Sequence, residues 1–175
     1  MKKIIIAISG ASGAHIGFNV LKELPEAMDK HLVVSDHAKV VLDKEMDLKH
    51  YKNSDIGASI ASGSYGADIM MITPCSMNTL AKIACGIADD LITRAASVMI
   101  KENKTLLLAP REMPFSAIAL ENMLKLSRLG VIIAPPVAAY YAETKSIDEM
   151  ENFFIGKWFD LVNIEHNLYK RWSSE

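Results

Sequence analysis

Short runs of apolar residues recur along the chain, and small or polar residues follow each of them. The runs lie at residues 4–8, 31–35, 69–73, 105–109 and 131–134. Bulky and β-branched side chains dominate them and leave little room for a polar face. This pattern is typical of strands that are buried on both faces of a parallel sheet. We therefore expect five such strands.

The segments between these runs favour helices. They span residues 14–24, 37–45, 77–86, 91–102, 117–129 and 146–162. Asp36 is a favourable N-cap, and Ser146 with Glu149 has the form of a capping box. Residues 46–59 are polar and irregular, which predicts a loop or a weak helix. Strands alternating with helices, without a repeat or linker, predict a doubly wound parallel α/β sheet that folds as one domain over residues 1–175.

The composition excludes several classes of protein. Of the 175 residues, 50% are apolar and the net charge is −2, which opposes nucleic-acid binding because that requires a basic face. Two cysteines are too few for a disulfide framework. The apolar run near the N-terminus is too short for a signal sequence or a membrane span. We expect a cytoplasmic protein with neither a nucleic-acid nor a membrane partner.

The first strand leads into a glycine-rich loop and then a predicted helix. Gly10 and Gly13 flank Ser12 in this loop, and Gly17 follows within the helix. Such a loop presents backbone N–H groups and the positive end of a helix dipole to an anion. The glycine spacing is not that of the dinucleotide fingerprint. The loop therefore indicates either a nucleotide or flavin site, or a tight turn without a ligand.

Polar residues follow four of the five predicted strands. Because the carboxyl ends of parallel strands meet at one edge of a sheet, these residues should converge there. They are Ser12, Ser35, Ser76, Arg111 and Glu112. This convergence favours a ligand site over an unoccupied turn.

Three cations, Arg94, Lys101 and Arg111, lie within eighteen residues. The first two are seven positions apart and share one helix face, which suits either an anionic substrate or a solvated surface. Glu112 is a candidate proton-transfer group, with an ion pair as the alternative. Cys75 suits a nucleophile or, more commonly, a buried core position. No histidine or cysteine cluster has metal-ligand spacing, so we expect no metal.

The chain also resembles a known family in several motifs that occur in a fixed order. They are GASGA (10–14), SDHAK (35–39), IASGS (60–64), PCSMNTLA (74–81), RAASVMIKE (94–102), PREMPF (110–115), LENMLKLSRLG (120–130) and PPVAAYY (135–141). These segments resemble the UbiX-type flavin prenyltransferases, formerly called small subunits of aromatic-acid decarboxylases. The similarity extends over nearly the whole chain.

The resemblance implies a Rossmann-like flavoprotein fold and a homododecamer with active sites between subunits. It implies a metal-independent reaction that joins the dimethylallyl group of dimethylallyl monophosphate to N5 and C6 of reduced FMN. The product would serve a UbiD-type decarboxylase. An apolar stripe on the last predicted helix is a candidate contact between copies, with an intramolecular core as the alternative. The stripe consists of Ile147, Met150, Phe154, Trp158 and Leu161.

The resemblance also implies roles for individual residues. Ser12 and Glu112 match the family's catalytic positions, and Glu45 matches a further acid of the site. The matches to flavin-binding positions are Gly10, Ala11, Ser12, Gly13, Ser35, Ser76, Thr79, Arg94 and Arg111. The matches to the donor-phosphate positions are Ser62, Lys101, Arg111, Tyr141 and Lys157. Lys157 stands where the family usually has an arginine, which weakens bidentate phosphate binding there.

Two other functions fit part of the pattern. The FMN-dependent cysteine decarboxylases resemble this chain in fold and FMN loops, but the segment PREMPF departs from theirs. A non-catalytic FMN-binding protein is the second alternative. Arg111 and Glu112 argue against it, whereas Lys157 keeps it open.

Overall fold

The computed structural model describes residues 1–10, 12–35, 48–142 and 144–171. The predicted helix at residues 37–45 lies outside this part, as do Ala11 and Glu45. The described chain divides into two compact units, Met1–Pro135 and Pro136–Glu175. The prediction of a single domain therefore stays a prediction, and we describe each unit by itself.

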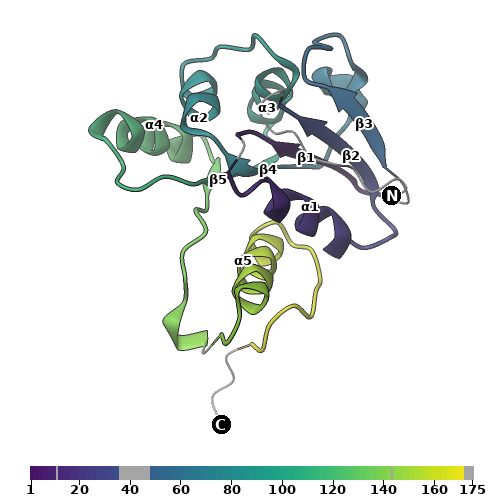
Figure 1. Cartoon of the computed structure of the whole chain (residues 1–175). Coiled ribbons are helices and arrows are strands. Elements are labelled where there is room, and N and C mark those ends of the chain that lie inside the picture. Colours follow the sequence, from purple (N-terminus) through teal and green to yellow (C-terminus); the bar gives the residue numbers. More distant parts are fainter. Residues whose placement is uncertain (11, 36–47, 143, 172–175) are drawn as a thin grey trace. The chain divides into compact units, whose positions relative to one another are not determined.

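The first unit is built on a six-stranded sheet in which every strand pairing is parallel (Figure 1). The strands are β1 (Lys3–Ile8), β2 (Asp29–Val34), β3 (Lys49–Lys52), β4 (Ile69–Cys75), β5 (Thr105–Pro110) and β6 (Ile132–Ile133). They lie in the order β3-β2-β1-β4-β5-β6. The doubly wound parallel sheet is thus confirmed. The chain builds outward from β1 to β3, then crosses to the other side of β1 for β4, β5 and β6, so the switch point lies between β1 and β4.

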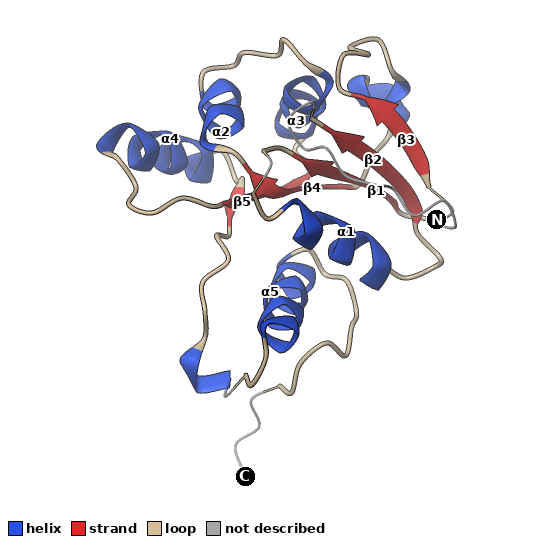
Figure 2. Ribbon diagram, in the orientation of Figure 1, coloured by secondary structure: helices blue, strands red, loops and turns tan. Residues whose placement is uncertain are grey.

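Helices cover both faces of this sheet. Helix α1 (Ala14–Glu23) lies on one face, and α2 (Met77–Ala84) and α3 (Leu91–Lys101) lie on the other (Figure 2). Helix α4 (Ala117–Arg128) packs beside α2. Two short 3₁₀ turns, η1 (Ser59–Ala61) and η2 (Gly63–Tyr65), precede β4. The second unit contains the 3₁₀ turn η3 (Tyr140–Ala142) and helix α5 (Ile147–Leu161).

The central strands are buried as the continuous apolar runs predict. Residues 4–8 of β1 have no exposed surface, and all seven residues of β4 are buried. Met70 and Ile72 of β4 belong to the core cluster that includes residues of α2 and α3. Each fully buried aliphatic side chain of this kind contributes about 1.5–3 kcal/mol of transfer free energy. The sheet is therefore a rigid base for the loops at its carboxyl edge.

One strand, β3, was not predicted, and another, β6, is shorter than predicted. Residues 49–52 form β3, where the polar sequence KHYK predicts a loop or weak helix. This strand is at the edge of the sheet and pairs only with β2, so backbone hydrogen bonds hold it and charged side chains are tolerated. Strand β6 covers only Ile132–Ile133 of the expected 131–134.

The apolar stripe on α5 is divided: Phe154 and Trp158 are buried, Met150 is half-buried, and the two end residues are exposed. Phe154 and Trp158 are only 8% and 2% exposed within this one chain, so their proposed role in contacts between copies is wrong. Ile147 and Leu161, at the two ends of the helix, are exposed. Exposed apolar side chains are also found on α4, at Ile118, Leu120 and Leu124.

Candidate functional site

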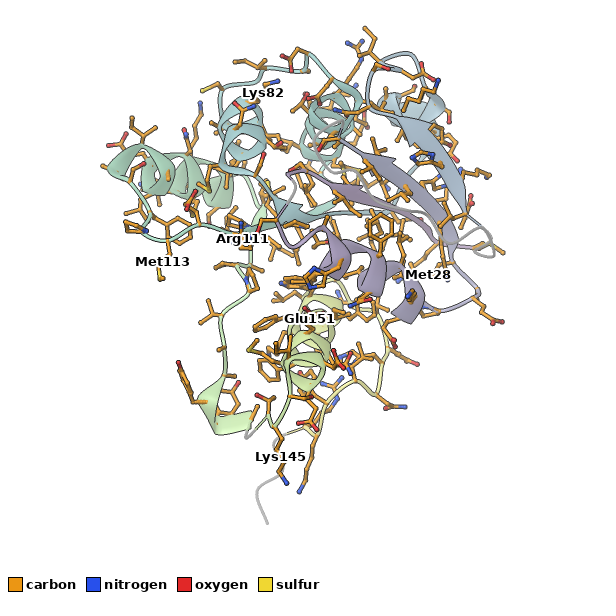
Figure 3. The ribbon with its side chains drawn as sticks, viewed as in Figure 1. Met28, Lys82, Arg111, Met113, Lys145 and Glu151 are labelled. Atoms are coloured by element: carbon orange, nitrogen blue, oxygen red, sulfur yellow. The ribbon has the colours of Figure 1, made fainter. Side chains whose placement is uncertain are left out.

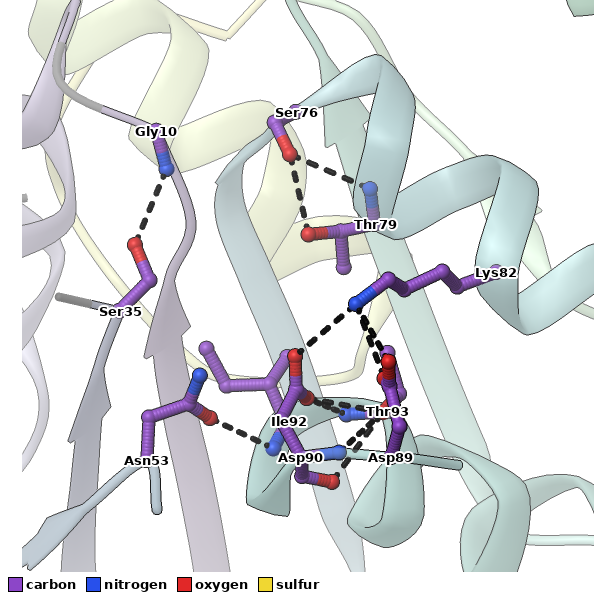
Figure 4. Close-up of polar contacts among 10 residues, drawn as sticks. All are labelled: Gly10, Ser35, Asn53, Ser76, Thr79, Lys82, Asp89, Asp90, Ile92 and Thr93. Atoms are coloured by element: carbon purple, nitrogen blue, oxygen red, sulfur yellow. Dashed lines mark hydrogen bonds and ion pairs between the residues drawn. The ribbon is translucent and has the colours of Figure 1, made fainter. Parts of the chain in front are cut away.

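Hydrogen bonds join the carboxyl ends of the strands on either side of the switch point. The backbone N–H of Ser9 donates to Pro74 O at 3.1 Å, and the buried Ser9 Oγ accepts from the backbone N–H of Ser76 at 2.9 Å. The N–H of Gly10 donates to Ser35 Oγ at 3.3 Å (Figure 4). The loops after β1, β2 and β4 therefore lie together, as the strand-end argument predicts. Sequence reasoning missed Ser9, because a serine at the end of a strand has no distinguishing pattern.

Two glycines shape the loop between β1 and α1. Gly10 has φ +95°, and a Cβ there would lie 3.4 Å from Ser76 Cβ. Gly13 has φ +79° and is the N-cap of α1. Both values lie in the left-handed region, which side-chain-bearing residues rarely adopt. Glycine therefore lets the loop turn tightly with its backbone against the β4 loop.

The N-terminus of α1 differs from those of the other helices. No side chain among the described residues caps α1. Helices α2, α3, α4 and α5 are each capped by a side-chain oxygen, from Ser76, Asp90, Ser116 and Ser146 respectively. The first N–H groups of a helix carry a partial positive charge and require an acceptor. The start of α1 is therefore suited to an anionic group.

Arg111 reaches this loop from the segment that leads from β5 to α4, on which Figure 3 labels Arg111 and Met113. Its Nε donates to Ser12 O at 3.3 Å, and its Cδ lies 3.5 Å from the position of a Cβ on Gly13. The ion pairs among the described residues do not include Arg111. The guanidinium is therefore available to an external anion. We call Ser9, Gly10, Ser12, Gly13, Ser35, Ser76 and Arg111 the switch-point cluster.

Glu112 is exposed beside Arg111. Its Oε1 accepts a hydrogen bond from the backbone N–H of Met113 at 3.1 Å. Within the described part of the chain, Glu112 does not form the ion pair that was its alternative role. The carboxylate is thus oriented by its own loop, and its role in proton transfer stays a prediction.

Ser76 and Thr79 bond to each other at the start of α2. Ser76 Oγ accepts from the N–H of Thr79 at 3.2 Å and donates to Thr79 Oγ1 at 3.0 Å (Figure 4). Ser76 thereby caps α2, and its Cβ lies 3.4 Å from the position of a Cβ on Gly10. Their predicted contact with a flavin remains a prediction.

Asn53 anchors the N-terminus of α3. Its backbone oxygen accepts from the N–H of Leu91 at 2.9 Å, and its side-chain oxygen accepts from the N–H of Ile92 at 3.0 Å. Because Asn53 directly follows β3, it places the first turn of α3, with the exposed Arg94, at the carboxyl edge of the sheet. Asp90 and Thr93 form a reciprocal capping box there. Sequence reasoning missed both of these contacts, although Asp90 directly before the apolar Leu91 is a recognisable N-cap signal.

Lys101 and Ser62 lie at the opposite edge of the sheet. Helix α3 spans 11 residues, about 16 Å at 1.5 Å per residue, and ends with Lys101 just before β5 begins. Lys101 Nζ pairs with Glu102 Oε1 at 3.2 Å, and the Glu102 carboxylate occupies the space that a side chain on Gly63 would fill. Ser62 Oγ bonds to Ser64 Oγ at 2.9 Å. We call Ser62, Gly63, Lys101 and Glu102 the amino-edge cluster.

Two further predicted residues belong to the unit Pro136–Glu175. Tyr141 is 67% exposed, and its ring meets that of Phe153 edge to face with centroids 6.0 Å apart. Lys157 is exposed on α5. Both are therefore accessible to a ligand.

The described residues offer neither a reactive cysteine at position 75 nor a metal-binding group. Cys75 is 1% exposed, and burial raises the pKa of its thiol to about 12, so the core interpretation is confirmed and the nucleophile interpretation is wrong. Within the described ranges, no three His, Cys, Asp or Glu side chains are grouped so that they could hold a metal ion. None of the described helices is both long and apolar enough to cross a bilayer.

Comparisons with known proteins agree with this geometry. The family model described as Flavoprotein matches residues 1–163. The flavin prenyltransferase UbiX of Helicobacter pylori is 48% identical, and the alignment covers 97% of this chain and 98% of that protein. A solved structure of AnUbiX in complex with FMN and dimethylallyl pyrophosphate is 38% identical, with a TM-score of 0.92 and coverage of 99% and 98%.

A second solved structure is that of a dodecameric FMN-dependent UbiX-like decarboxylase from Escherichia coli O157:H7. It is 38% identical, with a TM-score of 0.90, and the alignment covers 98% of this chain and all of that one. The FMN-dependent cysteine decarboxylase TvaF is 16% identical with a TM-score of 0.62, which shows a shared fold and no more.

Proposed function

The chain belongs to the flavin prenyltransferase family of flavoproteins, and from this premise we propose that it prenylates reduced FMN. The proposed donor is dimethylallyl monophosphate, whose dimethylallyl group is joined to N5 and C6 of the flavin. The observation that carries the proposal is the switch-point cluster. This cluster brings together three features: the uncapped N-terminus of α1, the glycine loop before it, and Arg111, which lies outside the described ion pairs.

The described residues fit the phosphate group of FMN. Gly10 and Gly13 remove the side chains that would keep an anion away from the loop backbone. The start of α1 supplies N–H donors, and Ser35 supplies a hydroxyl. Ser76 lies beside Gly10 and bonds to Thr79 at the start of α2, where we propose that both residues contact the isoalloxazine ring. Bound there, the reduced flavin supplies the nucleophilic nitrogen and carbon.

The chain's cations would stabilise the departing phosphate of the donor. An allylic phosphate ionises readily when fixed positive groups hold the leaving group. We assign this role to Arg94, Lys101, Arg111 and Lys157, with the hydroxyls of Ser62 and Tyr141. Glu112 would accept the proton that leaves C6, because its carboxylate is exposed next to Arg111.

The separation of the two clusters supports a site shared between copies of this chain. The amino-edge cluster lies across the sheet from Arg111, so a second copy would have to bring its Lys101 and Ser62 to the first copy's switch-point cluster. The dodecameric relative and the exposed apolar side chains of α4 support a large homo-oligomer of this kind. We propose a dodecamer.

Mixing two inactive variants tests this arrangement. Arg111→Ala and Lys101→Ala should each lower anaerobic, donor-dependent phosphate release by about 10²- to 10³-fold. When the two variants are co-expressed, about a quarter of shared sites receive both native residues, so activity should return to that extent. Mixed oligomers without recovered activity would contradict the shared site. Wild-type turnover in either single variant would remove that residue from the site.

The remaining proposals concern the setting of the reaction. The prenylated flavin would serve a UbiD-type decarboxylase in the cytoplasm. No observation on the described residues favours a cysteine decarboxylase or a non-catalytic FMN-binding protein over the transferase.

A further inference from the structure

The second unit contains a cluster of polar side chains around Asp160, near the end of α5. The Asp160 carboxylate accepts hydrogen bonds from His166 Nε2 at 3.1 Å, from an Arg171 terminal nitrogen at 2.8 Å, and from the hydroxyl of Tyr169. Burial alone would raise the pKa of Asp160, but these hydrogen bonds outweigh it and lower the pKa to about 2. The carboxylate is therefore a charged anchor for residues 162–171, which we call the C-terminal strap.

The strap also fixes the state of its histidine. His166 Nδ1 accepts from the backbone N–H of Leu168 at 3.1 Å, so in a neutral ring the proton sits on Nε2 and points at Asp160. The His166 side chain is 3% exposed. The strap is thus held by directional bonds at both ring nitrogens.

Gly156 provides the surface on which the strap rests. A Cβ at this position would lie 2.5 Å from Tyr169 Cδ1 and 2.7 Å from His166 Cε1. A glycine inside a helix costs about 1 kcal/mol relative to alanine, so it calls for a packing reason. Here the missing side chain lets the Tyr169 ring pack directly on the backbone of α5, one residue before Lys157.

An aromatic series runs from this point to η3. The rings of Tyr169 and Phe153 have centroids 5.0 Å apart, and Phe153 in turn meets Tyr141 edge to face. No hydrogen bond joins the exposed Tyr141 hydroxyl to another described residue. Tyr169 therefore packs on α5 at Gly156, the residue before Lys157, and a single ring, that of Phe153, separates it from Tyr141.

We propose that Tyr169, seated on Gly156 and bonded to Asp160, is a positioning residue that holds Tyr141 and Lys157 in place for the donor phosphate. The proposal rests on the proposed function, which assigns both residues to that phosphate. Phosphate binding requires groups fixed to within about 0.5 Å. A long lysine chain and an exposed tyrosine achieve this only if the backbone and rings beneath them are rigid.

Three variants separate the effect of the Tyr169 ring from that of its hydrogen bond to Asp160. Tyr169→Ala removes the ring, and we expect a KM for dimethylallyl monophosphate raised about tenfold or more, with the Kd for FMN unchanged. Tyr169→Phe keeps the ring on Gly156 but loses the bond to Asp160, so its KM should lie between those of the wild type and Tyr169→Ala. Tyr140→Phe, on the neighbouring residue that is 94% exposed, is the matched control and should change neither constant.

A readout independent of turnover completes the test. With 3-fluorotyrosine incorporated, the ¹⁹F signal of Tyr141, assigned through Tyr141→Phe, should shift in Tyr169→Ala. If Tyr169→Ala does not fold, Gly156→Ala keeps every side chain of the strap, displaces the ring, and should raise the same KM. An unchanged Tyr141 signal with a donor KM within twofold of wild type would overturn the proposal. Equal losses in donor and FMN binding would also overturn it. If the Tyr141 signal shifts in Tyr169→Ala but the wild-type protein itself shows no turnover, the proposed function is refuted instead.

Discussion

Gly17 links the packing of α1 to the anion site at its start. This glycine is buried in α1, and a Cβ there would lie 2.6 Å from Ile8 Cγ1 and closer still to the backbone oxygen of Thr73. Carbon atoms pack at about 3.5–4.0 Å, so Gly17→Ala forces α1 away from the sheet by about 1 Å. The Ile8 side chain can adjust, but the Thr73 carbonyl belongs to the core strand β4 and cannot.

The change in the free energy of unfolding caused by Gly17→Ala has two opposing contributions. Overpacking a core costs about 1–3 kcal/mol, whereas alanine gains about 1 kcal/mol over glycine in a helix. The difference is a net destabilisation of about 0–2 kcal/mol, and at the midpoint of about 1 kcal/mol the melting temperature falls by about 2–4 °C for a chain of this size. Because the N–H groups at the start of α1 move with the helix, FMN should bind about tenfold more weakly, as when one hydrogen bond to the phosphate is lost.

Thermal melting and fluorescence titration with FMN measure both effects. Lys22→Ala, at an exposed position on the same helix, is the control for a change in helix propensity and should leave FMN affinity unchanged. If Gly17→Ala melts at the wild-type temperature and binds FMN equally well, the close seating of α1 on β4 does not position the phosphate site.

Three further predictions test Thr73, the two cysteines and Asp160. Thr73→Val should raise the free energy of unfolding by about 1 kcal/mol in urea, because Thr73 Oγ1 is buried and has no hydrogen-bond partner among the described residues; a loss of stability would mean that the hydroxyl is paired. In the folded protein a thiol reagent should label the exposed Cys85 and spare Cys75, whose pKa is about 12; rapid labelling of both would contradict the burial of Cys75. The pKa of Asp160 is lowered from 3.8 to about 2, so its stabilising effect is present above pH 3.8 and is lost as the pH falls toward 2. The difference in melting temperature between wild type and Asp160→Asn should therefore shrink over that interval, and a constant difference would contradict the hydrogen-bonded carboxylate.

The hydrophobic pattern was sufficient to predict the central strands of the sheet. Strands β1, β4 and β5 are buried on both faces, so their sequences are nearly all apolar and stand out. Strand β3 was missed for the opposite reason: at the sheet edge its partner is the backbone of β2, and its side chains, apart from the half-buried Tyr51, are exposed. Edge pairing depends on the neighbouring strand, and a local sequence pattern does not show it.

The site was predictable where it depends on strand ends. The order of loops along the chain indicated that Ser35 and Ser76 would meet the glycine loop, because parallel strands end at one edge. The spacing of Arg94 and Lys101 also predicted that they lie on one helix. What the spacing did not reveal is that α3 carries Lys101 to the other edge of the sheet, next to Gly63.

Polar contacts between distant parts of the chain could not be predicted from the sequence. The buried His31 lies between the hydroxyls of Tyr51 and Tyr65, at 3.2 Å and 3.1 Å from its two ring nitrogens. The strap around Asp160 similarly joins residues up to eleven positions apart after the chain has turned back on α5. Such contacts depend on how loops return to the core, and neither periodicity nor local propensity encodes that path.

The most direct test of prenyl transfer is a mass spectrum of the flavin. The purified protein is mixed anaerobically with reduced FMN and dimethylallyl monophosphate, and the flavin is then released and weighed. We predict a flavin heavier by one dimethylallyl group, formed by the wild type and lost in Arg111→Ala. Unmodified FMN recovered from the folded wild-type protein, with both substrates present and bound, would contradict the assignment.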